Sequence, residues 1–197
     1  MLKKILSSTF VIYDTEYTAW KGSQENDWKR YGEYREIIEI GAVRASLCKN
    51  KIVVKEEFTV LVRPVKNPLL SGYIKKLCRI SQRMIEERGV LFQHAWKRFL
   101  NFTKGANIVL SFGEDNIVIR ENLKLNNVFY KINKSYWFDY KKIFIKESKL
   151  ARQIPIQSCD IPKALGIKSL RKQRHRALSD VFAQIQGLNK IFEKIDK

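Results

Sequence analysis

The amino-acid sequence predicts an α/β domain with a mixed five-stranded sheet flanked by helices. Three runs typical of β-strands come first, and a short Lys-Asn connection between the second and third suits an antiparallel hairpin. Two further strand-like runs each lead directly into a helical pattern. Strands followed by strand–helix alternation are typical of a mixed sheet. The 197 residues are enough for one well-packed core and few for two, so we expect a single domain over 1–197.

Each predicted element follows from a local pattern. Runs rich in Val, Ile, Tyr and Phe predict the strands, at 9–17, 36–47, 52–63, 106–112 and 135–140. Apolar residues at helical spacing predict the helices, at 69–80, 81–89, 91–102, 115–125, 141–151 and 177–195. The segment 19–35 is polar and aromatic without either period, and is predicted to be a loop.

Local signals sharpen two of these helices. Ser81 is a candidate N-cap and Gly89 a candidate stop for the helix between them. The helix at 91–102 is amphipathic, with an apolar side made of Phe92, Ala95, Trp96, Phe99 and Phe102. His94 falls on its polar side, so we expect that histidine to be exposed to solvent.

The formal net charge of +18, from 38 Lys and Arg against 20 Asp and Glu, favours a polyanionic partner. Nucleic acid is the first candidate and an anionic membrane surface the second, although a genome biased towards Lys, Ile and Asn would also raise the charge. No apolar stretch approaches the ~20 residues of a membrane span. We therefore expect nucleic acid as the partner and no membrane association.

Cysteine usage bears on compartment and on structural metal sites. The three cysteines are far apart in the sequence, at Cys48, Cys78 and Cys159, and no two form a CxxC pair. With only two histidines in the chain, this pattern argues against a structural zinc site. An odd number of separated cysteines fits a reducing compartment, so we expect a cytoplasmic protein.

The first predicted strand ends in two carboxylates, Asp14 and Glu16. Residues two apart on a strand point to the same face, so both carboxylates project together. Two acids that close repel each other unless a cation lies between them. Hard divalent ions such as Mg²⁺ or Mn²⁺ prefer oxygen ligands and would relieve that repulsion.

Two other acids begin predicted helices. Asp115 follows the turn "SFGE" after the fourth strand, where a plain helix N-cap is the structural alternative. Asp180 lies in "HRALSD" at the start of the last helix, five residues after His175, and there an acid also complements the helix dipole. The segment before it, "KSLRKQRHR", is strongly basic and includes Arg174, which suits contact with phosphates.

Together these motifs resemble the DEDDh group of 3′–5′ exonucleases, the DnaQ-like branch with an RNase H-like fold. The resemblance runs from about Phe10 to Ile195, with "DTEYT", "SFGED" and "HRALSD" in the family's order. Within the group, "EIIEIGAV", "LVRPVKNPLLS" and "WFDYK" are similar to segments of the Eri-type and KapD-like exoribonucleases. The combination is specific, although each motif alone is not.

The second motif departs from the pattern of many relatives. There it reads Trp-Gly-x-x-Asp, which would place the acid at Asn116, whereas here Phe112 replaces the Trp and the acid comes one residue earlier. The apolar residues of the following helix fit if Asp115 is the ligand. Glu114 is the alternative.

The resemblance implies a mechanism and a set of site residues. Two divalent ions, Mg²⁺ or Mn²⁺, would be held by the four acids Asp14, Glu16, Asp115 and Asp180, with His175 as the base. The substrate would be a single-stranded RNA or DNA 3′ end, with RNA favoured, cut to nucleoside 5′-monophosphates. A DNA exonuclease of proofreading or repair type is one alternative, and a nucleic-acid-binding module without turnover is another.

Three residues are expected to contact substrate. Thr18 follows the first carboxylates and has a counterpart in relatives that contacts the terminal nucleotide. Trp20 belongs to the aromatic and basic loop 19–35, where rings would stack on bases or, equally, pack the loop onto the sheet. Arg174 would meet phosphates. Glu39 on the second strand could support the metal site, but the sequence favours an ordinary strand-to-strand ion pair.

Overall fold

The computed structural model describes residues 2–6, 8–150, 156–170 and 175–195. Its centre is a five-stranded sheet in the order β3-β2-β1-β4-β5. In this sheet β2 is antiparallel to both its neighbours, and β1, β4 and β5 are parallel. The strands are β1 (Phe10–Tyr17), β2 (Ile37–Cys48), β3 (Lys51–Leu61), β4 (Ile108–Ser111) and β5 (Trp137–Asp139). The mixed five-stranded sheet confirms the predicted fold class.

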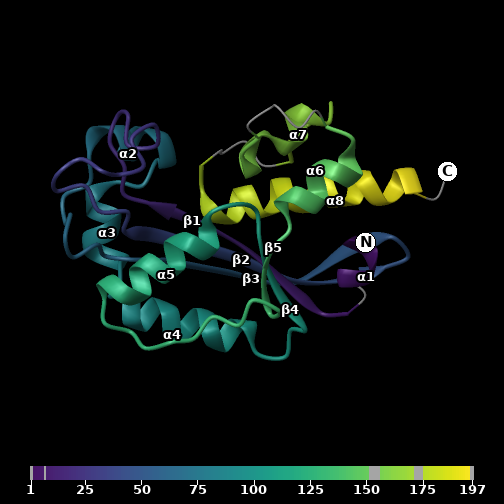
Figure 1. The fold of residues 1–197 in the computed structure, drawn as a ribbon, viewed down its shortest axis with the longest axis horizontal. Coiled ribbons are helices and arrows are strands. Elements are labelled where there is room, and N and C mark those ends of the chain that lie inside the picture. Colours follow the sequence, from purple (N-terminus) through teal and green to yellow (C-terminus); the bar gives the residue numbers. More distant parts are fainter. Residues whose placement is uncertain (1, 7, 151–155, 171–174, 196–197) are drawn as a thin grey trace.

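Helices cover both faces of the sheet. Figure 1 shows α4 and α5 on one side of it, and α6, α7 and α8 on the other. The helices are α1 (Leu2–Ile5), α2 (Gly72–Cys78), α3 (Gln82–Arg88), α4 (Phe92–Thr103), α5 (Asp115–Leu125), α6 (Lys141–Ser148), α7 (Ile161–Ala164) and α8 (Ala177–Ile195), with a 3-10 turn η1 (Ser158–Asp160). None of these helices combines the length and apolar character needed to cross a bilayer.

The alternation of side chains along β1 divides the core in two. Phe10 and Ile12 belong to the apolar cluster formed with α6 and α8, whereas Val11 and Tyr13 belong to the cluster formed with α4 and α5. Continuing the same period places Asp14 and Glu16 on the side of α8. The sheet thus directs both acids towards the last helix.

The start of α8 lies directly against β2 at Gly41. This glycine pairs with Asp14 across the sheet. A Cβ atom at Gly41 would lie 2.2 Å from the backbone nitrogen of Leu178 and 2.5 Å from the carbonyl carbon of Ala177. Only a residue without a side chain fits that space, so glycine is what permits the close approach of helix and sheet.

Most predicted elements are present, with small differences at their ends. Ser81 caps α3 by accepting a hydrogen bond from the backbone N–H of Met84, and Gly89 ends that helix, both as predicted. The apolar side of α4 is buried apart from Phe102, which is half-buried, and His94 is exposed. Two short helical pieces were not predicted: α1, and the η1–α7 segment that precedes the basic stretch.

Candidate active site

Three carboxylates from two distant segments meet beside the sheet. The oxygens of Asp14 and Glu16, at the end of β1, and of Asp180, in the first turn of α8, lie within 4.8 Å of one another. All three residues are buried, with relative exposures of 6%, 8% and 4%. The structure therefore brings together three of the four acids expected as metal ligands.

Polar side chains hold Asp14 in place. The hydroxyl of Ser158 in η1 donates to Asp14 Oδ1 at 3.0 Å, and the amide of Gln184 in α8 donates to the same oxygen at 3.3 Å. The hydroxyl of Tyr140 in turn donates to Gln184 Oε1 at 2.9 Å. Glu16 accepts a hydrogen bond from the thiol of Cys78, whose Sγ lies 3.1 Å from Glu16 Oε2. These contacts fix the carboxylates in orientation before any ligand binds.

The fourth acid, Asp115, lies at the start of α5 and is held by the other face of β1. Its Oδ1 accepts hydrogen bonds from the backbone N–H of Thr15 at 2.9 Å and from the Thr15 hydroxyl at 2.6 Å. Asp115 is not part of the 4.8 Å cluster, but it is buried at the same cavity. It is not a side-chain N-cap, because it occupies the first turn of the helix itself.

The residues on either side of Asp115 have other partners. The side chain of Glu114 is largely exposed and pairs with Arg35, Oε2 to Nη1, at 2.9 Å. Asn116 accepts a hydrogen bond from the hydroxyl of Tyr13 at 2.7 Å. Glu114 also lines the cavity, but its carboxylate pairs with Arg35, whereas Asp115 is buried there, so the geometry favours Asp115 over Glu114.

Burial and mutual repulsion perturb the acids strongly. Loss of hydration raises the pKa of Asp14 well above its usual value, and the charges of Asp115, Asp180 and Glu16 raise it further. The pKa of Glu16 is raised in the same way, by burial first and then by Asp180. Burial raises the pKa of Asp115 to about 6, against the lowering effect of the Thr15 hydrogen bonds. Such a concentration of negative charge fits a site that receives cations.

His175 lies at the edge of the same cavity, just before α8. It is half-buried, its backbone is left-handed with φ of 53°, and its Nε2 lies 3.9 Å from Cys159 Sγ in η1. The ligand atoms of Cys159, His175 and Asp180 also lie within 4.8 Å of one another. The imidazole is thus adjacent to the acids, where a general base would be needed.

Glu39 fixes the beginning of α8. Its carboxylate accepts from Arg176, Nε to Oε2 at 3.0 Å and Nη2 to Oε1 at 2.5 Å, and from the backbone N–H of Ala177 at 3.0 Å. Glu39 is 1% exposed. The predicted strand-to-strand ion pair is therefore wrong: the pair joins a strand to the helix start, because α8 packs on β2 at this point.

A cavity of about 370 Å³ opens in front of the acids. Aromatic side chains line it, among them Trp20, Trp28 and Tyr73, and Lys141 lies at its rim with its Nζ 5.5 Å from the ring of Phe112. The cavity therefore combines a deep acidic floor with aromatic walls and a cation. This combination suits a strand end whose bases stack on the rings and whose phosphate meets the acids through bound cations.

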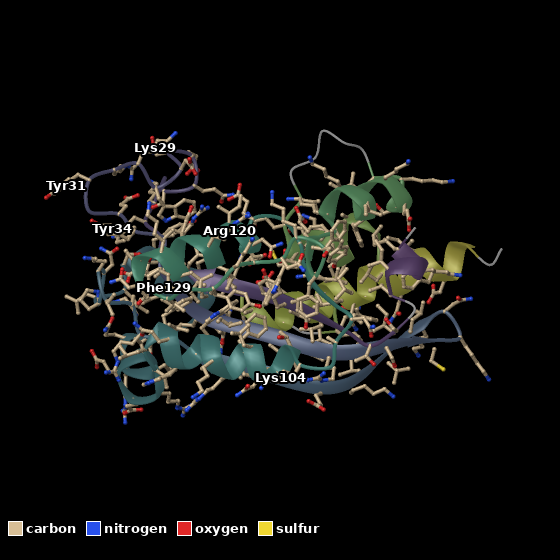
Figure 2. The ribbon with its side chains drawn as sticks, turned by 60° about the horizontal axis from the view of Figure 1, so that its bottom comes forward. Lys29, Tyr31, Tyr34, Lys104, Arg120 and Phe129 are labelled. Carbon is tan, nitrogen blue, oxygen red and sulfur yellow. The ribbon has the colours of Figure 1, made fainter. Side chains whose placement is uncertain are left out.

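The other predicted substrate residues lie as follows. The Thr18 hydroxyl donates to the carbonyl of Tyr34 at 2.5 Å, and Thr18 is 2% exposed and does not line the cavity, so its role stays a prediction. Arg174 lies outside the described residues. In the loop 19–35, Figure 2 shows Lys29, Tyr31 and Tyr34 on the outer side, and Tyr31 is fully exposed.

Trp28 packs the loop against the sheet and also lines the cavity. Its indole N–H donates to the carbonyl of Thr18 at 2.9 Å, and its ring lies edge-on to Tyr17. The guanidinium of Arg35 stacks over the same ring at 5.0 Å. Of the two predicted roles for the loop aromatics, this tryptophan anchors the loop while still facing the cavity.

The comparison with protein families assigns this arrangement. The exonuclease family RNase T matches residues 11–188. The chain belongs to the RNase T exonuclease family. Membership of the DEDDh 3′–5′ exonuclease group, predicted from the three motifs, is confirmed, and the chain is a 3′–5′ exonuclease. The acidic cluster agrees with the divalent-metal use that this family implies.

Solved structures share the fold at low sequence identity. The nuclease domain of 3′hExo, a DEDDh family member bound to rAMP, is 19% identical with a TM-score of 0.78, covering 95% of this chain and 93% of that one. A zinc-bound E. coli exonuclease I complex with single-stranded DNA is 16% identical with a TM-score of 0.63, covering 96% of this chain and 43% of that one. No curated protein matches the chain.

Several site residues escaped the sequence analysis. Ser158, Gln184 and Cys78 each contact a carboxylate of the buried cluster, and Lys141 and Tyr73 line the cavity. Only Gln184 had a usable signal, since it follows Asp180 by four residues and so lies on the same face of α8. The others come from segments whose positions depend on the tertiary fold.

Proposed function

We propose that this exonuclease removes nucleotides one at a time from single-stranded 3′ ends, with RNA favoured, and releases nucleoside 5′-monophosphates. We further propose that residues 1–197 act as one exonuclease domain in a reducing, cytoplasmic setting. The observation that carries the proposal is the meeting of Asp14, Glu16 and Asp180 at the floor of one cavity, with Asp115 and His175 beside them.

The donor set fits divalent cations. Three buried carboxylates within 4.8 Å supply oxygen ligands. Burial first, and then repulsion among the acids, raises the pKa values of Asp14 and Glu16, and a bound cation would relieve that repulsion. Asp14, Glu16, Asp115 and Asp180 would hold two ions, Mg²⁺ or Mn²⁺. When bound, these ions neutralise the charge that develops on the phosphate and on the departing oxygen.

The chain's own residues handle the proton and the substrate. His175 accepts the proton of the attacking water at its imidazole, whose usual pKa of about 6.5 suits that role near neutral pH. The water oxygen forms a bond to the terminal phosphorus as the bond to the 3′-oxygen breaks, and the departing 3′-oxygen then takes up a proton. Trp20 and Tyr73 would stack on the terminal bases, and Lys141 would meet a phosphate.

Two observations support an RNA end. The similar 3′hExo domain is described as bound to rAMP, and a second similar structure concerns recognition of a histone mRNA stem-loop by a 3′-exonuclease. That second structure is 18% identical with a TM-score of 0.76, covering 95% of this chain and 83% of that one. The net charge of +18 supports nucleic acid of either kind.

The deciding assay follows 5′-labelled RNA and DNA strands of one sequence, with free or blocked 3′ ends, in Mg²⁺ or Mn²⁺. Asp14→Asn and Asp180→Asn should lower kcat by at least ~10³-fold, because each removes a charge on which the transition state depends. Asp27→Asn is the matched control, since Asp27 is an exposed loop acid outside the cavity. Full activity of Asp14→Asn, or activity in excess chelator, would exclude the proposed site.

The same strands separate the alternatives. Faster digestion of DNA than of RNA would indicate a repair or proofreading enzyme. Tight, chelator-insensitive binding without release of mononucleotides would indicate a binding module. The acidic floor argues against the module, because uncompensated carboxylates repel phosphate.

A further inference from the structure

A second group of metal-ligating side chains overlaps the carboxylate cluster. The thiol of Cys159, the imidazole of His175 and the carboxylate of Asp180 place one ligand atom each within 4.8 Å of the others. We infer that these three residues form a zinc site that is distinct from the oxygen-only magnesium or manganese site and shares Asp180 with it. Two of the three residues, His175 and Asp180, also line the cavity.

The donor distances suit tetrahedral zinc. Zn–S and Zn–N bonds of about 2.3 and 2.0–2.1 Å at a tetrahedral angle separate sulfur from nitrogen by about 3.6 Å. Cys159 Sγ and His175 Nε2 lie 3.9 Å apart, so a small rotation of either side chain completes the geometry. Thiolate, imidazole and carboxylate are the three ligand types that zinc accepts in proteins.

The fold holds the ligands on two segments that are packed together. Cys159 lies in η1, whose Ser158 hydrogen-bonds to Asp14 and whose residues pack against α8. His175 lies two residues before α8 and Asp180 lies in its first turn, and Glu39 fixes this start of the helix through the N–H of Ala177. Cys159 is 8% exposed, so its thiol is directed into the protein rather than at bulk solvent. The site is therefore largely formed before the metal arrives.

Ligand chemistry separates the two metal sites. Mg²⁺ and Mn²⁺ prefer oxygen donors, which Asp14 and Glu16 provide, whereas a thiolate beside an imidazole selects zinc. Zinc at Cys159 would occupy His175, the proposed base, and Asp180, one of the proposed ligands of the catalytic ions. This consequence rests on the proposed function: zinc would act as a brake on hydrolysis, which magnesium in excess would not release.

The binding test uses Co²⁺ as a spectroscopic substitute for zinc, added to the metal-free full chain in excess Mg²⁺. A thiolate ligand gives an intense sulfur-to-cobalt absorption in the near ultraviolet, which carboxylate and imidazole ligands do not. We expect this band in the wild-type protein, its displacement by Zn²⁺, and its loss in both Cys159→Ser and Cys159→Ala. Loss of an outer-shell partner alone costs about 10- to 100-fold in metal affinity, so loss of the thiolate should weaken zinc binding at least that much.

Two control variants identify the sulfur. Cys48→Ser changes an exposed thiol at the far end of β2, and Cys78→Ser changes the thiol that contacts Glu16. Both should keep the band. The His175→Asn protein should still show the sulfur-to-cobalt band but bind Co²⁺ more weakly. Asparagine tolerates the left-handed backbone at that position. A band that is absent from the wild-type protein, or that disappears with Cys78 and survives without Cys159, would overturn the inference.

The kinetic test is separate from the binding test. Zinc is titrated into the Mg²⁺-supported reaction, and each variant is compared with its own zinc-free rate. We expect the zinc concentration for half-inhibition to rise at least ~10-fold in Cys159→Ser and to be unchanged in Cys48→Ser. Equal inhibition of both would refute the brake, even where cobalt binds. An inactive wild-type protein with an intact cobalt band would refute the proposed function and leave the site standing.

Discussion

Replacing Gly41 by alanine would test whether the contact between β2 and α8 sets the catalytic geometry. The added Cβ would lie 2.2 Å from the backbone nitrogen of Leu178, whereas ordinary contacts begin at 3.4 Å. The clashing atoms belong to the backbone of α8 and cannot rotate away, so the start of this helix must move from the sheet by about 1 Å. Asp180 lies two residues beyond Leu178 and moves with it. A misplacement of ~1 Å can cost about 10²-fold in rate, and we expect a loss of that size in kcat.

The assay is single-turnover cleavage of a 5′-labelled oligonucleotide, with thermal unfolding followed by circular dichroism. Overpacking of this kind destabilises a fold by ~1–3 kcal/mol, so rates are measured well below the melting temperature. Gly72→Ala is the matched control, because nothing lies within 4 Å of a Cβ there and Gly72 begins α2 with an ordinary backbone. A folded Gly41→Ala protein with the wild-type rate would refute the reasoning.

Three further predictions follow from the contacts around the acids. The pKa of Asp115 in the folded protein is about 6 and exceeds its value in the unfolded chain, so the stability of the metal-free protein should fall as pH rises from ~4 through ~6. The fall should be less steep in Asp115→Asn, and thermal melts in the presence of chelator measure both. Thr15→Val removes a hydrogen bond that lowers that pKa, so the acid limb of the pH–rate profile should move to higher pH. Glu39→Gln weakens charged hydrogen bonds to Arg176 and Ala177, and should cost ~1–3 kcal/mol of unfolding free energy in urea titrations.

The sequence predicts the sheet and the long helices well because their signals are local. The run 177–195 has a helical apolar period over its whole length, and α8 has those bounds. The helix at 115–125 follows a glycine turn and is likewise recovered as α5. The η1–α7 segment was not predicted, because its apolar residues follow neither the helical nor the strand period and because it contains a proline at position 162. Its conformation depends on packing against α8.

The site residues also fall into those that a local pattern predicts and those that only the tertiary fold brings together. The period of two along β1 puts Asp14 and Glu16 on one face, which sequence reasoning can establish. Whether Asp180 reaches them depends on Gly41, which only the tertiary fold shows to be in contact with α8. The hydrogen bond from Ser158 to Asp14 joins residues 144 apart in the chain, and no local pattern predicts it. Glu39 was misread for that reason too, since its partner lies on the helix side of the sheet.

The place of the site follows from where β1 loses its neighbour. Pairing with β4 ends at Ile12, while pairing with β2 continues to Tyr17, so the last part of β1 extends beyond the parallel half of the sheet. A crevice forms at the carboxyl ends of parallel strands, where ligands bind in open α/β sheets. Here α5 starts on one side of it and α8 crosses on the other. The side chains of Asp14 and Glu16 point towards α8, whereas Thr15 between them donates hydrogen bonds to Asp115 at the start of α5. One strand end therefore positions acids from both layers, and a change of register by one residue would exchange the acids for Thr15 and dismantle the site.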